Sequence, residues 1–269
     1  GRCVVDAPAG VTRTLRQLFP TLSVANEARR DTSPSGEPAD LTFESSTGGW
    51  RVRWDGGEEF LDRGEALAAA ELTVTRRLLE ADTQRVHLHG TAAVGRSGRA
   101  ALAVGPSGSG KSTLAYAWYR QDRPLFGDDV VVLDEQGRLH PFPRPLTVDA
   151  ERLREAGERP EAAPGWTPGD PDVWVDPRRR GGWAGDGIRE GVVAEIAYRN
   201  EGGTTWDLLE GAERLRVLLG AVHQTGRDRS DALDALIGLV ESVPVYRVRH
   251  ADAGALARAL LERVDEGNR

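Results

Sequence analysis

The residues whose types and spacing best suit chemistry form one short stretch, which reads Gly-Pro-Ser-Gly-Ser-Gly-Lys-Ser-Thr from Gly105 to Thr113. Glycines let backbone N–H groups turn inward, so a loop of this kind forms a concave site for anions. A helix that begins directly after the loop adds unpaired N–H donors and the positive end of its dipole. The stretch therefore predicts a loop that holds phosphate groups.

Lys111 and Ser112 are the members of this loop that can act on a nucleotide. The ammonium group of Lys111 can reach the β- and γ-phosphates, and the hydroxyl of Ser112 can bind Mg²⁺. Lys111 is also the only lysine in the sequence. A lone lysine where a compact ammonium group is needed favours a nucleotide site over a Gly/Ser-rich turn without a ligand. The predicted ATP-binding residues are Gly105, Ser107, Gly108, Ser109, Gly110, Lys111, Ser112 and Thr113.

The segments on both sides of the loop have suitable patterns. Residues 100–104 are apolar and predict a strand that enters the loop, and residues 112–121 predict a helix that leaves it. Residues 86–94 predict a second strand, separated from the first by a short turn, so we expect the two strands to be antiparallel neighbours. Most phosphate-loop proteins instead surround the loop strand with parallel strands.

Asp128 and Asp129 precede the apolar run 130–133. Adjacent side chains at the start of a strand point to opposite sides, so one carboxylate can accept a hydroxyl proton while the other meets Mg²⁺. Two neighbouring like charges also raise one pKa, as a base working near neutrality requires. On spacing alone, a turn in which the aspartates bond to their own backbone is an equal alternative.

A second acidic pair, Asp134 and Glu135, follows the same apolar run. It is similar to the acidic pair that ends a strand in motor-type ATPases and there serves Mg²⁺ and water. Gln136 and Gly137 come next, so we favour a hairpin turn with solvated carboxylates.

Histidines occupy two positions on the predicted strand 86–94. His87 and His89 share one face because side chains alternate along a strand. His89 precedes Gly90, which lets another group approach closely. A histidine on a strand is more often structural than functional, so the sequence pattern alone does not assign a function to His89.

Three segments together resemble one family. His89-Gly90, the phosphate loop and Gly127-Asp128-Asp129 occur in the order in which HPr serine kinase/phosphorylase carries a His-Gly pair, a phosphate loop and an Asp-Asp pair. ATP-type phosphoenolpyruvate carboxykinase, which shares that fold, has a similar Asp-Asp segment. The proline-rich run 141–146 resembles HPr-kinase-related proteins, some of which phosphorylate a peptide serine in ribosomal-peptide pathways, including lasso-peptide pathways.

The resemblance implies a role for each of these residues. Asp128 would be the base or acid at the acceptor hydroxyl, and His89 would orient it. Asp129 and Ser112 would support Mg²⁺, and Lys111 would act on the γ-phosphate. Thr113 stands where HPr kinases usually carry glutamate. This departure argues against HPr itself as the substrate, and the implied acceptor is a serine of a peptide or protein.

Pattern and resemblance together predict an α/β protein with the phosphate-loop fold of HPr kinase and phosphoenolpyruvate carboxykinase, in which a mixed, largely antiparallel sheet is flanked by helices. Residues 1–62 alternate in short runs and carry turn signals, so we expect a small β-rich N-terminal portion. Residues 63–269 form the predicted ATP-binding catalytic domain. Helices are expected near 64–82, 207–223, 229–241 and 252–265, and strands near 192–197 and 243–248.

Composition limits the function classes. The net charge of −7 argues against a nucleic-acid partner. We see no signal peptide and no apolar run of the roughly 18–20 residues that would span a membrane. Cys3 is the only cysteine, so no internal disulfide is possible and a cytoplasmic location is expected. Self-association into a homo-oligomer is left open.

Three functions remain at this stage. The first is an ATP-dependent kinase for a peptide or protein serine, and the second is a small-molecule kinase on the same fold. The third is a nucleotide-gated binding protein without catalysis, against which the intact Asp128-Asp129 pair argues. A carboxykinase-like lyase would need a further lysine, which the sequence lacks. Arg144 or Arg178–Arg180 are candidates for an added phosphate contact, and Trp166, Trp174 and Trp183 have no assigned role.

Overall fold

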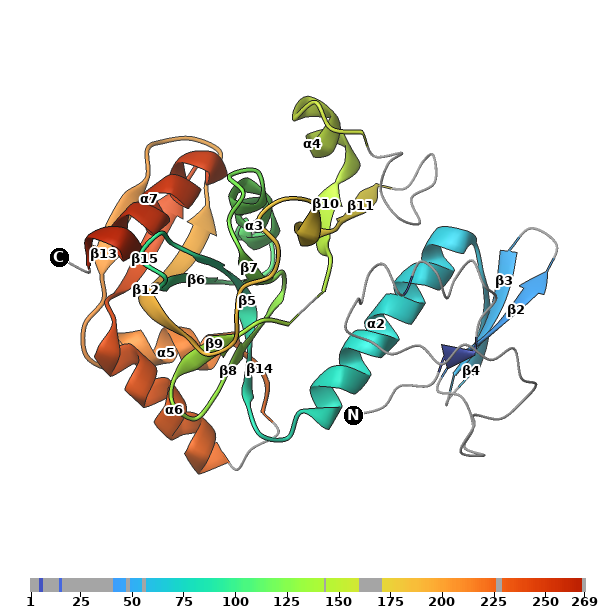
Figure 1. The fold of residues 1–269 in the computed structure, drawn as a ribbon, viewed down its shortest axis with the longest axis horizontal. Helices are drawn as coiled ribbons and strands as arrows, with labels where there is room; N and C mark the ends of the chain where they lie inside the picture. The colour runs from blue at the N-terminus through green and yellow to red at the C-terminus, as the bar shows by residue number, and fades with distance from the viewer. Residues whose placement is uncertain are drawn as a thin grey trace. The chain divides into compact units, whose positions relative to one another are not determined.

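The computed structural model describes residues 5–6, 15, 41–46, 49–54, 57–142, 144–159, 171–225 and 229–267. The chain divides into two compact units. One unit comprises Gly1–Asp82 with Asp149–Asp176, and the other comprises Thr83–Val148 with Pro177–Arg269. Figure 1 shows the elements of both, and each unit is described by itself.

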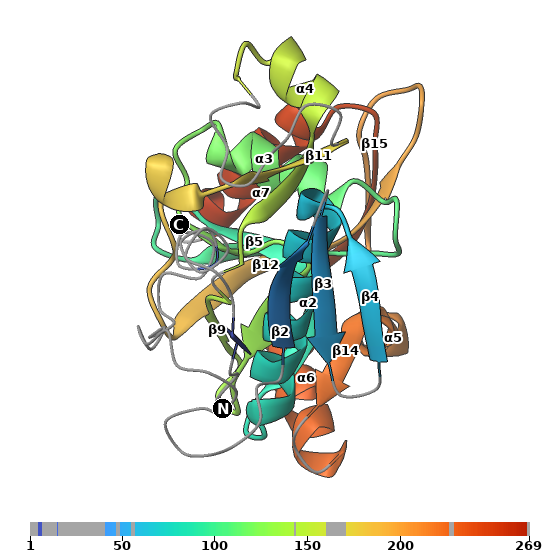
Figure 2. The ribbon, with the colours of Figure 1, turned by 90° about the vertical axis from the view of Figure 1, so that its right-hand side faces the viewer.

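The first unit contains a four-stranded sheet in the order β1-β2-β3-β4. Strand β3 is antiparallel to both β2 and β4, and β1 runs parallel to β2. Figure 2 shows β2, β3 and β4 side by side with helix α2 behind them. The elements are β1 (Val5–Asp6), β2 (Leu41–Ser46), β3 (Gly49–Trp54), β4 (Gly57–Leu61), α2 (Arg63–Ala81), α4 (Ala150–Glu155) and β11 (Asp172–Val175).

Helix α2 belongs to this first unit. It begins at a capping box in which Asp62 accepts from the Glu65 N–H and the Glu65 side chain accepts from the Asp62 N–H. Its buried face carries Leu67 and Val74, which pack in one core with Phe43 of β2. The unit thus extends past the boundary expected at residue 62, because this helix covers the small sheet.

The second unit is built on a sheet with the order β13-β15-β12-β6-β5-β8-β9. Strand β12 is parallel to β6 and β15, and the other pairings are antiparallel. The prediction of a mixed, largely antiparallel sheet is confirmed, as is the antiparallel pairing of β5 with β6. Its strands are β5 (Val86–Val94), β6 (Ala100–Val104), β7 (Leu125–Gly127), β8 (Val130–Leu133), β9 (Arg138–His140), β12 (Ile188–Tyr198), β13 (Thr205–Leu208), β14 (Val222–Thr225) and β15 (Val245–His250), and β10 (Leu146–Asp149) ends at the boundary of the unit.

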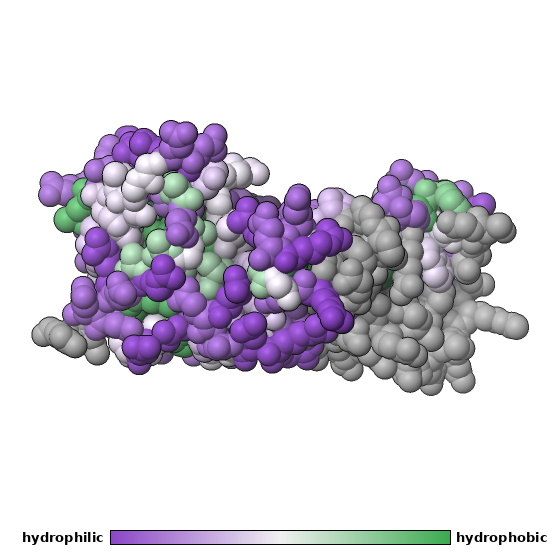
Figure 3. All heavy atoms as spheres, turned by 90° about the horizontal axis from the view of Figure 1, so that it is seen from above, coloured by the Kyte–Doolittle hydropathy of each residue, from purple (hydrophilic) through white to green (hydrophobic). Residues whose placement is uncertain are grey.

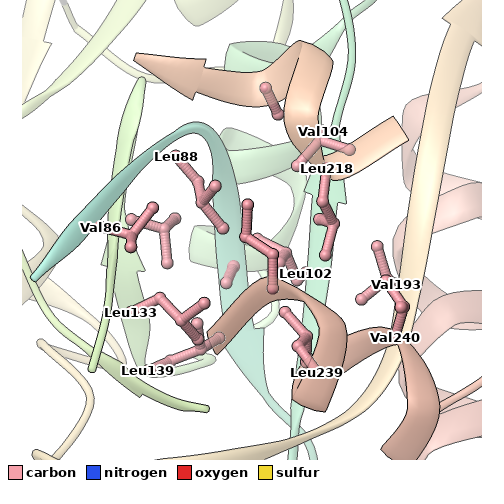
Figure 4. Close-up of a cluster of buried hydrophobic side chains, with 14 of the residues drawn as sticks. Val86, Leu88, Leu102, Val104, Leu133, Leu139, Val193, Leu218, Leu239 and Val240 are labelled. Atoms are coloured by element: carbon pink, nitrogen blue, oxygen red, sulfur yellow. The ribbon is translucent and has the colours of Figure 1, made fainter. Parts of the chain in front are cut away.

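Helices flank both faces of this sheet. Helices α3 (Lys111–Tyr119) and α7 (Ala253–Glu266) pack together, and the indole of Trp118 donates to the backbone oxygen of Ala257. Helices α5 (Ala212–Ala221) and α6 (Arg229–Ser242) contribute to the core cluster on the other face. The loop strand β6 presents Leu102 and Val104 to that cluster, which Figure 4 shows in close-up. Burying a side chain such as Leu102 contributes about 1.5–3 kcal/mol.

The surface is in keeping with the composition. Seen from above, hydrophilic residues cover much of the described surface, with smaller apolar areas between them (Figure 3). Among the described residues, no helix combines the length and the apolar character needed to cross a lipid bilayer.

Candidate active site

The phosphate loop connects the end of β6 to the start of α3, as the sequence predicts. Gly110 is the N-cap of α3 and has φ 96°, a left-handed conformation that favours glycine. Gly105 is restricted by space as well, because a Cβ atom there would lie 2.6 Å from the backbone oxygen of Ile196. The glycines therefore allow the loop to turn tightly while its backbone stays close to β12.

Lys111 lies inside the loop and is almost fully buried. Its Nζ donates to the backbone oxygens of Gly105 and Pro106, at 2.9 Å each. Burial lowers the pKa of Lys111 from its usual value of 10.5, while the charges of Asp129 and Asp128 act in the opposite direction. The ammonium group is thus held at the loop, where the charges of both aspartates act on it.

Asp128 is buried beside the start of α3. It lies between β7 and β8, and its Oδ2 accepts from the Thr147 N–H at 3.2 Å. The Ser112 hydroxyl is near enough to the carboxylate to act against the rise of its pKa. Its Oδ1 is buried and has no hydrogen-bond partner among the described residues. Burial and the neighbouring Asp129 raise the pKa of Asp128 to about 6.

The side chain of Asp129 has other partners than that of Asp128 and is 43% exposed. Its Oδ2 accepts from the Arg144 guanidinium at 3.1 Å. His89 Nδ1 lies 3.2 Å from the backbone oxygen of Asp129 and 3.7 Å from its Oδ1. Asp129 has φ 72°, and its backbone oxygen also accepts from the Gly90 N–H at 3.3 Å. The contacts of His89 therefore go to Asp129, whereas the resemblance had implied that His89 orients Asp128.

These residues suit a magnesium–nucleotide complex. Ser112 and Asp128 bring a hydroxyl and an unsatisfied carboxylate oxygen together, and oxygen ligands of this kind are what Mg²⁺ prefers. Within the part of the chain that the structure describes, no three His, Cys, Asp or Glu side chains are grouped as metal ligands. Bound Mg²⁺ would therefore take its remaining ligands from phosphates and water.

The second acidic pair lies in a hairpin turn, as the sequence favoured. Strands β8 and β9 are antiparallel, and Asp134 Oδ1 accepts from the N–H groups of Gln136 and Arg138. The Asp134 side chain is only 16% exposed, however, and its Oδ2 lies 2.7 Å from Nε2 of His140, so this carboxylate is less solvated than expected. Burial favours a raised pKa for Asp134, but the bonds from His140 and the two amides outweigh it and lower the pKa.

The other residues named from the sequence have separate locations. Arg144 joins the site through Asp129. Arg180 follows the short helix η2 (Pro177–Arg179), lies over the Tyr119 ring and pairs with Asp122. Trp183 pairs with Leu125 of β7, and Trp174 packs against the core of the first unit. Trp166 lies outside the described residues.

His250 is a member of the site that the sequence reasoning missed. It is buried at the end of β15, and its Nε2 lies 3.3 Å from the backbone oxygen of Ser109. Burial lowers the pKa of His250, so the ring is neutral at pH 7 and can donate from Nε2. No local signal joins His250 to a loop that lies 141 positions earlier in the chain.

Glu190 was also not anticipated, and it gives a pH prediction. It is buried on β12, and burial raises its pKa from 4.5 to about 8. The folded protein therefore holds this proton up to about pH 8, while the unfolded chain loses it near pH 4.5, so stability should fall as the pH rises between these values. In Glu190→Gln, the free energy of unfolding should fall by a few kcal/mol less between pH 5 and pH 8.5 than in the unaltered protein. Urea unfolding at the two pH values measures this difference.

The matched control for Glu190→Gln is Glu213→Gln, which changes an exposed glutamate on α5. It should leave the pH dependence of the unfolding free energy as it is in the unaltered protein. Parallel stability curves for Glu190→Gln and the unaltered protein would contradict the prediction.

Comparison with known proteins adds little to this geometry. No protein-family model matches the chain, and no curated protein matches it. Among solved structures, the Hpr(Ser) kinase/phosphatase from Coxiella burnetii is similar at 13% identity and a TM-score of 0.35, covering 68% of this chain and 95% of that chain. This likeness is distant, so the function proposed below rests on the contacts of the site itself.

Proposed function

We propose that this protein is a kinase that transfers the γ-phosphoryl group of ATP to a serine hydroxyl of a peptide or protein. One observation carries the proposal. A phosphate loop with its lysine, the Ser112 hydroxyl near a buried carboxylate, and a second, accessible carboxylate come together beyond the end of β6. Phosphoryl transfer needs these parts because its catalysis is mostly positioning and charge stabilisation.

The nucleotide would be held by the loop. Backbone N–H groups of residues 107–113 and the start of α3 would cradle the phosphates. The charges of both aspartates already act on the buried Lys111, so its ammonium would interact with the terminal phosphates on the same side of the loop. A charge in such a low-dielectric setting interacts more strongly than it would in water.

We assign Ser112 and Asp128 to the magnesium side of the site. When bound, Mg²⁺ neutralises the charge of the terminal phosphates and of the leaving group. Asp128 is almost completely buried near the Ser112 hydroxyl, and its unpaired Oδ1 needs a partner. Leaving such an oxygen unsatisfied costs free energy that a cation would recover.

We assign Asp129 and His89 to the acceptor side. A general base must be within reach of the proton that it accepts. The Asp129 side chain is exposed, whereas Asp128 is buried, so Asp129 is the carboxylate that an acceptor can reach. In the transfer, a carboxylate oxygen of Asp129 takes the serine proton, the serine oxygen bonds to the γ-phosphorus, and the bond to the β-phosphate oxygen breaks. His89 and Arg144 hold the carboxylate in place. These assignments exchange the two aspartate roles that the resemblance implied.

A peptide or protein acceptor agrees with the exposure of Asp129. Sites for small molecules bury most of their ligand in a cleft. The Asp129 side chain is instead open to solvent over nearly half of its surface, 43%, so a chain segment can approach it from outside.

The experiment is transfer of label from γ-labelled ATP with Mg²⁺ to a set of serine-containing peptides. Each peptide has a control in which its serine is replaced by alanine. Label should enter the serine peptides alone and be recovered as phosphoserine. Nucleotide binding without transfer to any peptide, protein or small hydroxyl compound would refute the kinase and leave the nucleotide-gated binding protein.

A further inference from the structure

An exposed aromatic side chain lies beside the phosphate loop and has no part in the function described so far. Tyr198 is the last residue of β12 and is 50% exposed. Strand β12 runs parallel to the loop strand, with Glu195 opposite Val104. It therefore continues past the end of β6, and Tyr198 lies at the edge of the sheet where the loop begins.

Tyr198 packs beside the phosphate loop and against His250, which contacts that loop. A Cβ atom on Gly110 would lie 3.8 Å from Cβ of Tyr198 and 3.2 Å from the His250 ring. The Tyr198 and His250 rings meet edge to face, with centroids 5.8 Å apart. His250 in turn contacts the backbone oxygen of Ser109. Tyr198 is thus held against the loop through the buried histidine.

The direction of the bound triphosphate follows from the sheet order. The aspartate pair lies on the β5 side of β6, next to β7 and β8, and β12 and β15 lie on the other side (Figure 1). The γ-phosphate must lie towards the aspartates, where the acceptor arrives. The nucleoside end then leaves the loop in the opposite direction, over the ends of β12 and β15, where ligands of α/β sheets bind.

We propose that Tyr198 is the stacking platform for the nucleobase of ATP bound in the phosphate loop. This inference rests on the proposed function. The nucleobase would stack on the exposed face of the tyrosine ring. This contact would shield the apolar face of the base from water. Trp206 and Tyr246 form a second aromatic pair on the same sheet, but this pair is less suited to stack a base. The guanidinium of Arg263 already covers both rings, and its Cζ is 4.0 Å from the Trp206 ring centroid.

The test compares Mg²⁺–ATP with Mg²⁺–tripolyphosphate, which has the phosphates but no base. Binding of each is measured by calorimetry for the unaltered protein, Tyr198→Ala, Tyr198→Phe and Leu208→Ala. Tyr198→Ala should weaken ATP binding about tenfold, as expected for loss of one base–aromatic stack, and leave tripolyphosphate binding unchanged. Tyr198→Phe keeps the ring and should restore most of the loss. Leu208→Ala removes an exposed apolar side chain of β13 and should change the affinity for neither ligand.

The outcomes separate this inference from the function on which it rests. If the unaltered protein binds ATP and Tyr198→Ala binds it equally well, the stacking role is wrong and the nucleotide site stands. Equal weakening of ATP and tripolyphosphate would show that Tyr198 only supports the loop, which also overturns the inference. If the unaltered protein binds neither ligand, the proposed function fails as well.

Discussion

Lys111→Ala is expected to reduce phosphoryl transfer by at least about 10²–10³-fold, the loss that follows removal of one preorganised charge contact to a transition state. The physical reason is the location of the ammonium group. It is buried at the loop, 2.9 Å from two backbone oxygens, and the charges of both aspartates act on it. No other lysine in the sequence can take its place. The measurement is the initial rate of label transfer at saturating ATP.

Two further variants make the Lys111 result specific. Lys111→Arg keeps the charge but replaces a compact ammonium with a broad planar group in a buried position, so it should also be nearly inactive. Arg120→Ala removes an exposed cation at the other end of α3 and should retain the normal rate. Retained transfer in Lys111→Ala would refute the nucleotide site, since the sequence has no second lysine to replace the lost ammonium group.

The two aspartate variants should have different defects. Asp129→Asn is expected to lower transfer by about 10²–10⁴-fold, because it removes the group that accepts the serine proton, with ATP affinity nearly unchanged. Asp128→Asn should instead weaken ATP binding and abolish its dependence on Mg²⁺. Asparagine is close in size to aspartate, so both variants remove a charge with little change in volume.

Each aspartate variant is the control for the other. Transfer rate and ATP affinity are measured over a range of Mg²⁺ concentrations, and thermal unfolding checks that both proteins are folded. If Asp128→Asn keeps Mg²⁺-dependent ATP binding and loses transfer, while Asp129→Asn loses that binding, the two assignments are reversed. The roles implied by the family resemblance would then hold.

The parts of the fold that local sequence determines were predictable. The glycines of the phosphate loop, the apolar run before it and the short turn between β5 and β6 are local signals, and the structure has the expected strands. The five expected helices correspond to α2, α3, α5, α6 and α7. One start is wrong, because residues 205–208 form strand β13 where a helix was expected from residue 207. Pairing with β15 decides that segment, and the partner strand is distant in sequence.

The contacts of the site were less predictable because they join distant segments. The sequence predicted that Asp128 and Asp129 point to opposite sides of a strand start. It did not predict which of the two is buried or which residues contact each of them. Thr147 and Ser112 contact Asp128, while His89 and Arg144 contact Asp129. These pairings depend on the order of strands in the sheet, and residue spacing carries no information about that order.

The division of the chain has a practical consequence for protein engineering. The backbone passes between the two units three times, after residues 82, 148 and 176. Deleting the N-terminal 82 residues would therefore leave a 28-residue excursion, Asp149–Asp176, without the sheet on which its unit is built. A minimal catalytic fragment must begin at residue 83 and also replace that excursion with a designed connection from residue 148 to residue 177.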